Sequence, residues 1–169
     1  MAIRLPSRYT RGVAPSMTDH ATPCPAAIPR ITRRWSLASD PTLIEPVIDS
    51  IVALCVAAGF SERHCRLNVP VAITEALANA MLRGNDRDVT RAVQVRVEVD
   101  GYALRVEVAD EGPGFDLATL QQSPDEADWF ERDDGRGVFL MRTLMDGVES
   151  NGPDAVGGHC VRLTLQRTS

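Results

Sequence analysis

The chain has 169 residues, of which 44% are apolar, with a formal net charge of −5 and a pI of about 5.2. This size and composition indicate one domain with its own hydrophobic core, and the acidic balance argues against a general phosphate-seeking surface for nucleic acid. All 18 basic residues are arginine, which excludes a P-loop lysine, a Schiff-base lysine and a lysine general base. No apolar run approaches the roughly 20 residues of a membrane span.

Cysteines and histidines show no metal-binding or disulfide pattern. The four cysteines are scattered without a CxxC pair, and the three histidines lack the spacing of metal ligands: Cys24, Cys55, Cys65, Cys160, His20, His64 and His159. We therefore expect reduced thiols in a cytoplasmic protein, and histidines that are surface or packing residues.

The N-terminal stretch is rich in proline and arginine and has little apolar periodicity. It predicts a flexible arm over residues 1–30, followed by a single domain over residues 31–169. The arginine-rich start also resembles a transit peptide in composition, and Met17 is an alternative start; we rank both below a plain extension.

The domain begins with a predicted strand and two helices. Residues 31–37 alternate in polarity, which predicts a strand at a sheet edge or at a dimer contact. Asp40 and Pro41 are typical of a helix start, and this strongly apolar helix should end at Gly59. A second helical run starts near Ser61, and Pro70 must kink or restart it.

The helix predicted over residues 71–85 organises the rest of the chain. Its apolar stripe consists of Ile73, Ala76, Leu77, Ala80 and Met81. Glu75, Asn79 and Arg83 recur every fourth residue on the other side, so they point the same way from neighbouring turns. A solvated helix face is one interpretation. Because asparagine is a mediocre helix former, we favour the other, in which Glu75 and Asn79 face a pocket.

Two hairpins and a third helix follow. Residues 92–99 and 102–109 alternate in polarity on either side of Asp100-Gly101, which predicts an antiparallel pair of strands. Residues 117–134 are irregular and acidic, which suggests a mobile flap anchored by Trp129 and Phe130. A helix then opens at Gly135-Arg136-Gly137 and should bury Val138, Leu140, Met141, Leu144 and Met145. Residues 148–150 and 160–166 complete the second hairpin, and Gly157-Gly158 allows close backbone approach.

Two glycine loops are candidate ligand sites. Asp110 ends a strand, and Gly112 and Gly114 follow in the sequence DEGPGF; this is either a ligand-binding corner or a tight Asp-Gly turn. The sequence Gly135-Arg136-Gly137 places N–H groups and an arginine at a helix start, which suggests an anion site, although glycine also starts helices for structural reasons alone.

The order of these motifs is more specific than each motif alone. A helix with E-x-x-x-N, a strand ending in D-x-G-x-G-F, an irregular flap and G-R-G-x-x-L-M-R-x-L-M-D form one series. This series resembles that of the GHKL (Bergerat-fold) ATPases, and its last motif is similar to that of the bacterial anti-sigma factors with serine-kinase activity. The resemblance covers about residues 31–167 and implies an α+β two-layer sandwich, with helices on one face of a mixed, mostly antiparallel sheet.

The resemblance implies a role for each motif residue. Asn79 would coordinate the Mg²⁺ that bridges the ATP phosphates, and Glu75 would be the general base. Asp110 would accept from the adenine amine, with Gly112 and Gly114 shaping the pocket floor. Residues 111–134 would form the lid, and Gly135, Arg136 and Gly137 would meet the β and γ phosphates.

Three residues depart from the family pattern. Arg83 stands where a histidine is common, which affects a phosphate or structural contact, and we count it among the nucleotide-binding residues. His159 and Cys160 stand where the family usually has threonine near the adenine, so that a weaker adenine contact or a bridging water is expected there.

The resemblance also implies a function and its partners. The leading hypothesis is an anti-sigma factor with protein-serine kinase activity, which would phosphorylate a STAS-type antagonist protein and, when free of it, hold a sigma factor; a homodimer is a family-based expectation. The alternatives are a nucleotide-sensing regulatory module without kinase activity and a detached ATP-binding domain of another signalling pathway. No histidine stands in a suitable helical segment, which argues against self-phosphorylation.

Overall fold

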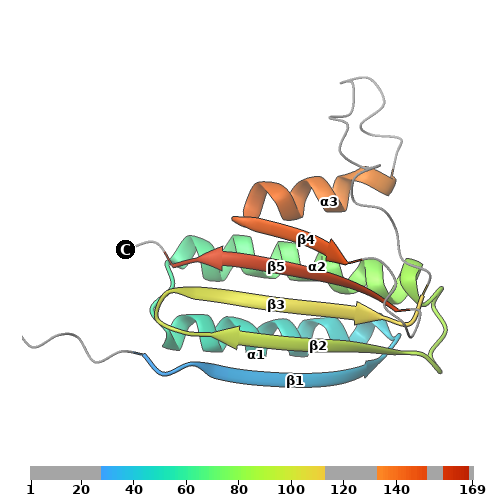
Figure 1. Cartoon of the computed structure of the whole chain (residues 1–169), viewed down its shortest axis with the longest axis horizontal. Helices are drawn as coiled ribbons and strands as arrows, with labels where there is room; N and C mark the ends of the chain where they lie inside the picture. The colour runs from blue at the N-terminus through green and yellow to red at the C-terminus, as the bar shows by residue number, and fades with distance from the viewer. Residues whose placement is uncertain (1–27, 113–132, 152–157, 168–169) are drawn as a thin grey trace, which may run out of the picture.

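The protein forms two layers, a five-stranded sheet and a layer of helices (Figure 1). The computed structural model describes residues 28–112, 133–151 and 158–167. The strands are β1 (Ile31–Ala38), β2 (Ala92–Val99), β3 (Ala103–Asp110), β4 (Gly147–Asn151) and β5 (His159–Gln166), and the α-helices are α1 (Ile44–Ala57), α2 (Val69–Asn79) and α3 (Asp133–Leu144).

The strand order across the sheet is β1-β2-β3-β5-β4. All pairings among the described strands are antiparallel, and β5 lies between β3 and β4. The α+β sandwich is therefore confirmed, and so is the position of β1 at a sheet edge. Most of the predicted N-terminal arm, and residues 113–132 of the lid predicted over residues 111–134, lie outside the described residues.

The core forms where the valine-rich strands meet the helices. Val93, Val95, Val97 and Val99 of β2 point toward the helices, as their alternation predicted, and all are at most 1% exposed. The predicted stripe of the central helix is buried against them. In the helix layer, α2 contacts α1 on one side and α3 on the other, so the central helix lies in the middle of the molecule (Figure 1).

The first helix begins and ends as the sequence predicts. The Asp40 carboxylate accepts from the Thr42 N–H at 2.9 Å and Pro41 opens a 3₁₀ turn that leads into α1. After the helix, Gly59 takes φ = +77°, a left-handed conformation that favours glycine.

Wide π-helical turns flank α2 on both sides. The first covers His64–Asn68 and is followed directly by α2, with Pro70 in its first turn. Because proline has no N–H to donate, the chain restarts the helix at this point instead of continuing a regular one. The second π turn covers Ala80–Gly84 and ends where the Asn85 N–H donates to the Ala80 carbonyl at 2.8 Å.

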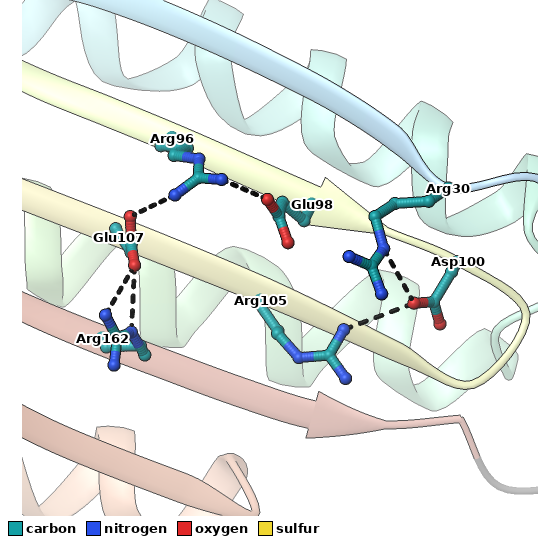
Figure 2. Close-up of polar contacts among 7 residues, drawn as sticks. All are labelled: Arg30, Arg96, Glu98, Asp100, Arg105, Glu107 and Arg162. Atoms are coloured by element: carbon teal, nitrogen blue, oxygen red, sulfur yellow. Dashed lines mark hydrogen bonds and ion pairs between the residues drawn. The ribbon is translucent and has the colours of Figure 1, made fainter.

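The face of the sheet opposite the helices carries a row of charges (Figure 2). Glu107 on β3 accepts from Arg162 on β5 at 2.8 Å and lies 3.4 Å from an Nη atom of Arg96 on β2; Arg96 also pairs with Glu98. The hydrogen bond and charge of Glu107 raise the pKa of the Arg162 guanidinium above its usual value. These pairs connect the three central strands on the open face.

The hairpin between β2 and β3 is closed by an aspartate side chain. Asp100 Oδ1 accepts from the N–H groups of Tyr102 and Ala103 at 2.8 and 2.9 Å, while Oδ2 lies 3.3 Å from Arg105 and 3.7 Å from Arg30 (Figure 2). Burial of Asp100 raises its pKa, but these hydrogen bonds and the Arg105 charge outweigh burial and leave the pKa below its ordinary value. The predicted Asp-Gly hairpin is confirmed.

Among the described cysteines, Cys55, Cys65 and Cys160 are thiols, and Cys24 lies outside the described residues. Burial, with a smaller contribution from Cys65, raises the pKa of Cys55 to about 12. Within residues 28–112, 133–151 and 158–167, no helix has the length and apolarity needed to span a bilayer.

Candidate functional site

The polar side of the central helix holds two of the predicted site residues in half-buried positions. Glu75 and Asn79 lie one turn apart on α2, and the apolar stripe of the same helix is buried. Arg83 belongs to the following π turn and is exposed. The change from α to π hydrogen bonding lies between Asn79 and Arg83, so the straight line of three polar residues that we predicted does not continue to Arg83.

Gly137 of α3 lies directly against Glu75 and Asn79. A β-carbon at position 137 would lie 2.6 Å from Glu75 Oε2 and 3.4 Å from Asn79 Nδ2. With a β-carbon at this position the Glu75 carboxylate would have to move, so glycine lets α3 approach the two polar side chains in the orientation that they have here. The structure therefore brings Gly137 against Glu75 and Asn79, a pair that is far from it in the sequence.

The other two residues of the Gly-Arg-Gly motif lie differently. Among the residues that the structure describes, a β-carbon at Gly135 would meet nothing within 4 Å, and Arg136 is exposed. The helix α3 begins at Asp133, so the motif lies inside the first turns and does not open the helix as predicted. Helix N-termini carry unpaired N–H groups and a partial positive charge, which attract anions.

Of the predicted buried face, Val138, Met141 and Met145 are buried and Leu140 and Leu144 are half-buried.

Asp110 lies at the other end of the central helix. It is the last residue of β3 and only 5% exposed, and its Oδ1 accepts from the Gly112 N–H at 2.9 Å. A β-carbon at Gly112 would lie 1.8 Å from the Gly84 carbonyl oxygen, and one at Gly84 would lie 2.3 Å from Asp110 Cγ. The turn after β3 therefore rests directly on the end of the helical run. Gly114 lies outside the described residues.

His159 faces Asp110 across the sheet. The two residues are register partners on β5 and β3, and His159 Nδ1 lies 3.8 Å from Asp110 Oδ2. A β-carbon at Gly158 would lie 2.6 Å from the Asp110 carbonyl oxygen, which agrees with the close backbone approach predicted there. Because side chains alternate along a strand, Cys160 points to the open face of the sheet. Of the two departures in β5, only His159 belongs to the site.

Asn85 is a buried polar residue that the sequence analysis did not single out. It is 0% exposed, its Oδ1 accepts from the Glu111 N–H at 2.9 Å, and its Nδ2 donates to Ser39 Oγ at 2.9 Å and to the Ala92 carbonyl at 3.1 Å. It thereby ties the turn after Asp110 to the ends of β1 and β2. The sequence clue that could have singled out Asn85 is its position directly after Gly84, the glycine that ends the helix.

The two predicted glycine corners thus contact one helical run, at Gly137 and at Gly112. Within the described part of the chain, no group of three or more histidine, cysteine or acidic side chains forms a metal site.

A groove of about 560 Å³ lies elsewhere, between α1 and α2. Its walls include Ile44, Ile48 and Val52 of α1 and Pro70 and Thr74 of α2. Neither Glu75 nor Asn79 lines this groove, so it is separate from the site described above.

Comparison with known proteins agrees with this geometry. Residues 37–165 match the family model described as the histidine kinase-like ATPase domain. The chain is 35% identical over 86 residues to the serine-protein kinase RsbW of Bacillus licheniformis, and the same holds for that of Bacillus subtilis (strain 168); each match covers 48% of this chain and 54% of the relative.

The serine-protein kinase RsbW of Listeria monocytogenes serovar 1/2a is 30% identical over 105 residues, which are 59% of this chain and 66% of that protein. The chain spans about half the length of the first two relatives. The family match covers most of the chain, including every residue of the site, and it agrees with the GHKL motif series. The chain belongs to the family of histidine kinase-like (GHKL) ATPase domains.

Proposed function

We propose that this protein is an ATP-dependent protein-serine kinase that also acts as an anti-sigma factor. It would transfer the γ-phosphate of ATP to a serine of a STAS-type antagonist protein and bind a sigma factor when free of that antagonist. The observation that carries the proposal is the position of Glu75 and Asn79 against Gly137 on α3, together with Asp110 at the far end of the same helical run. The similarity to serine-protein kinases RsbW supports it.

In this proposal Glu75 is the general base. Its carboxylate takes the proton of the attacking serine hydroxyl, the serine oxygen forms a bond to the γ-phosphorus, and the bond from that phosphorus to the β,γ-bridging oxygen breaks. ADP leaves with the electron pair of the broken bond. Because Glu75 is half-buried on the central helix, it can be reached by a substrate while its backbone stays fixed.

Asn79 is the residue that would hold Mg²⁺. Its amide oxygen is a neutral, hard ligand, which suits an ion that takes most of its ligands from phosphates and water. The bound ion would neutralise charge that develops on the phosphates. Gly137 keeps the space beside Asn79 and Glu75 open, since any larger residue would fill it.

Asp110 would bind the adenine end of the nucleotide. A carboxylate held at a strand end can accept from the exocyclic amine of adenine, which guanine lacks at that position. Gly112 and Gly114 would form the pocket floor, the residues from 111 to 134 the lid, and Gly135, Arg136 and Gly137 the phosphate contacts. Arg83 would serve as an outer phosphate contact.

A regulatory module that senses nucleotide without transferring phosphate is the second candidate. Arg83 and His159, which depart from the family pattern, favour it. In either case we propose a cytoplasmic protein that acts on protein partners and not directly on nucleic acid or membranes, and we propose a homodimer as its assembly.

The test is a Glu75→Gln variant incubated with Mg·ATP and a candidate STAS-type antagonist. Loss of a general base should lower phosphotransfer by roughly 10²–10⁴-fold while Mg·ATP binding is kept. Equal phosphotransfer by the variant would remove Glu75 from the mechanism. Mg·ATP binding without phosphotransfer by the wild-type protein would favour the regulatory module.

A further inference from the structure

Ser150, His159 and Asp110 form a chain of polar side chains at the end of the sheet. The His159 ring is 1% exposed; its Nε2 lies 2.6 Å from Ser150 Oγ on β4 and its Nδ1 lies 3.8 Å from Asp110 Oδ2 on β3. The three residues come from neighbouring strands, because β5 lies between β3 and β4.

The surroundings of the ring decide which nitrogen carries the proton. If Nε2–H donated to Ser150, the lone pair of Nδ1 would face the carboxylate of Asp110, which is electrostatically unfavourable. If the Ser150 hydroxyl donates to Nε2, the proton lies on Nδ1 and faces Asp110 Oδ2. For a neutral ring the second arrangement is therefore the electrostatically favoured one, with the Ser150 hydroxyl as the donor to Nε2.

Asp110 is hydrogen-bonded through one oxygen, and its other oxygen faces the imidazole at 3.8 Å, a distance at which the attraction is electrostatic and is not a hydrogen bond. Its Oδ1 accepts from the Gly112 N–H at 2.9 Å, and its Oδ2 faces the Nδ1–H of His159. A β-carbon at Gly84 or at Gly158 would run into Asp110, so the backbone leaves no space for the residue to move. A carboxylate held in this way keeps one orientation toward any ligand at the strand end.

We propose that His159 is a positioning residue for base recognition, which acts through Asp110 and is itself oriented by Ser150. The inference rests on the proposed function, because it assigns to His159 the task of presenting Asp110 to the exocyclic amine of adenine. Because the His159 ring is only 1% exposed, we expect it to act through Asp110 and not through its own contact with the nucleotide. Its effect on affinity is therefore confined to nucleotides that carry the amine.

The experiment compares ATP with purine riboside triphosphate, which lacks the amine, by calorimetric titration. The wild-type protein should prefer ATP. His159→Leu keeps the volume but removes the donor, and it should weaken ATP binding on the order of tenfold without changing the affinity for purine riboside triphosphate. His159→Asn retains a donor close to the position of Nδ1 and should keep most of the preference.

Two serine variants complete the set. Ser150→Ala should reduce the preference for ATP by a smaller factor, because it removes only the residue that orients the ring. Ser36→Ala is the matched control. Ser36 lies on β1, away from the site, and its hydroxyl accepts from the Gln94 side chain at 2.9 Å, so removing this hydroxyl should leave the affinities for both nucleotides unchanged.

The outcomes separate the inference from the proposed function. Unchanged preference in His159→Leu and Ser150→Ala, or an equal loss for both nucleotides, overturns the role of His159 while leaving ATP binding intact. A wild-type protein that binds neither nucleotide overturns the proposed function and this inference together. If His159→Leu does not fold by circular dichroism, the comparison of His159→Asn and Ser150→Ala with Ser36→Ala decides.

Discussion

Glu75 Oε2 lies so close to Gly137 that a β-carbon at position 137 would be only 2.6 Å from it. This contact joins the central helix to the helix that follows the predicted lid. It explains why a glycine stands at position 137. The geometry of the site therefore depends on the distance between α2 and α3.

Replacing Gly137 with alanine should harm activity more than stability. The atom that the new methyl group would meet is the end of a flexible side chain, so Glu75 can turn away and the fold can persist. A base displaced by about 1 Å should lower phosphotransfer by up to roughly 10²-fold. Turnover of an antagonist protein and thermal denaturation of the same variant measure the two effects separately.

Gly135→Ala is the matched control for this substitution. A β-carbon there meets none of the described residues within 4 Å, and alanine keeps the backbone N–H that an anion would use. Because glycine is a poor helix former, the variant should be more stable by about 0.5–1 kcal/mol. Its loss of phosphotransfer should be much smaller than that of Gly137→Ala, because the backbone N–H is unchanged. Similar loss of activity in both variants would contradict the role assigned to the contact between Gly137 and Glu75.

Gly112→Ala should destabilise the fold itself. The new β-carbon would lie 1.8 Å from the Gly84 carbonyl oxygen, which is backbone and cannot turn aside. We expect a loss of about 3 kcal/mol or more in the free energy of unfolding, measured by urea denaturation. Gly147→Ala, whose β-carbon would lie 3.5 Å from Thr164 Cβ, should cost far less. Equal costs would mean that the turn after β3 does not rest on the helix.

Asp100→Asn should change the pH dependence of stability. The pKa of Asp100 is lowered in the folded protein, so its ionised form stabilises the fold at pH values above the unfolded value of 3.8. This contribution is lost as the pH falls below 3.8 through the lower folded value. The variant should be less stable than the wild type by about 1 kcal/mol at neutral pH.

Urea denaturation between neutral pH and pH 3 tests this expectation. The difference in the free energy of unfolding between wild type and Asp100→Asn should shrink only in the acidic range. Asp49→Asn, at an exposed position of α1, controls for the change in net charge. A difference that stays constant to the lowest pH would show that the hydrogen bonds of Asp100 do not depend on its charge.

The local features of the fold could be predicted because local patterns determine them. Alternating valines predicted β2, and the i, i+3, i+4 stripe predicted the burial of α2 and the positions of Glu75 and Asn79 opposite it. The position of Asp110 at a strand end followed from the same alternation.

Features that depend on contacts between distant segments could not be predicted in the same way. Alternation shows which residues of β5 share a face, but not that β5 lies between β3 and β4, so the pairing of His159 with Asp110 was not foreseen. The π turn after Asn79 also left no periodic signal, and it is the reason that Arg83 departs from the predicted line. The start of α3 at Asp133 was missed because the preceding acidic segment has no helical periodicity.

The dependence of ATP affinity on Mg²⁺ in wild type and in Asn79→Ala tests the central claim most directly. Calorimetric titration should show that Mg²⁺ raises the ATP affinity of the wild type, and that Asn79→Ala loses at least the roughly tenfold increment typical of a removed metal-site partner. The affinity in the presence of EDTA should stay the same in both proteins. No binding of ATP by the wild type, or an equal Mg²⁺ increment in Asn79→Ala, would contradict a magnesium nucleotide site on this helix.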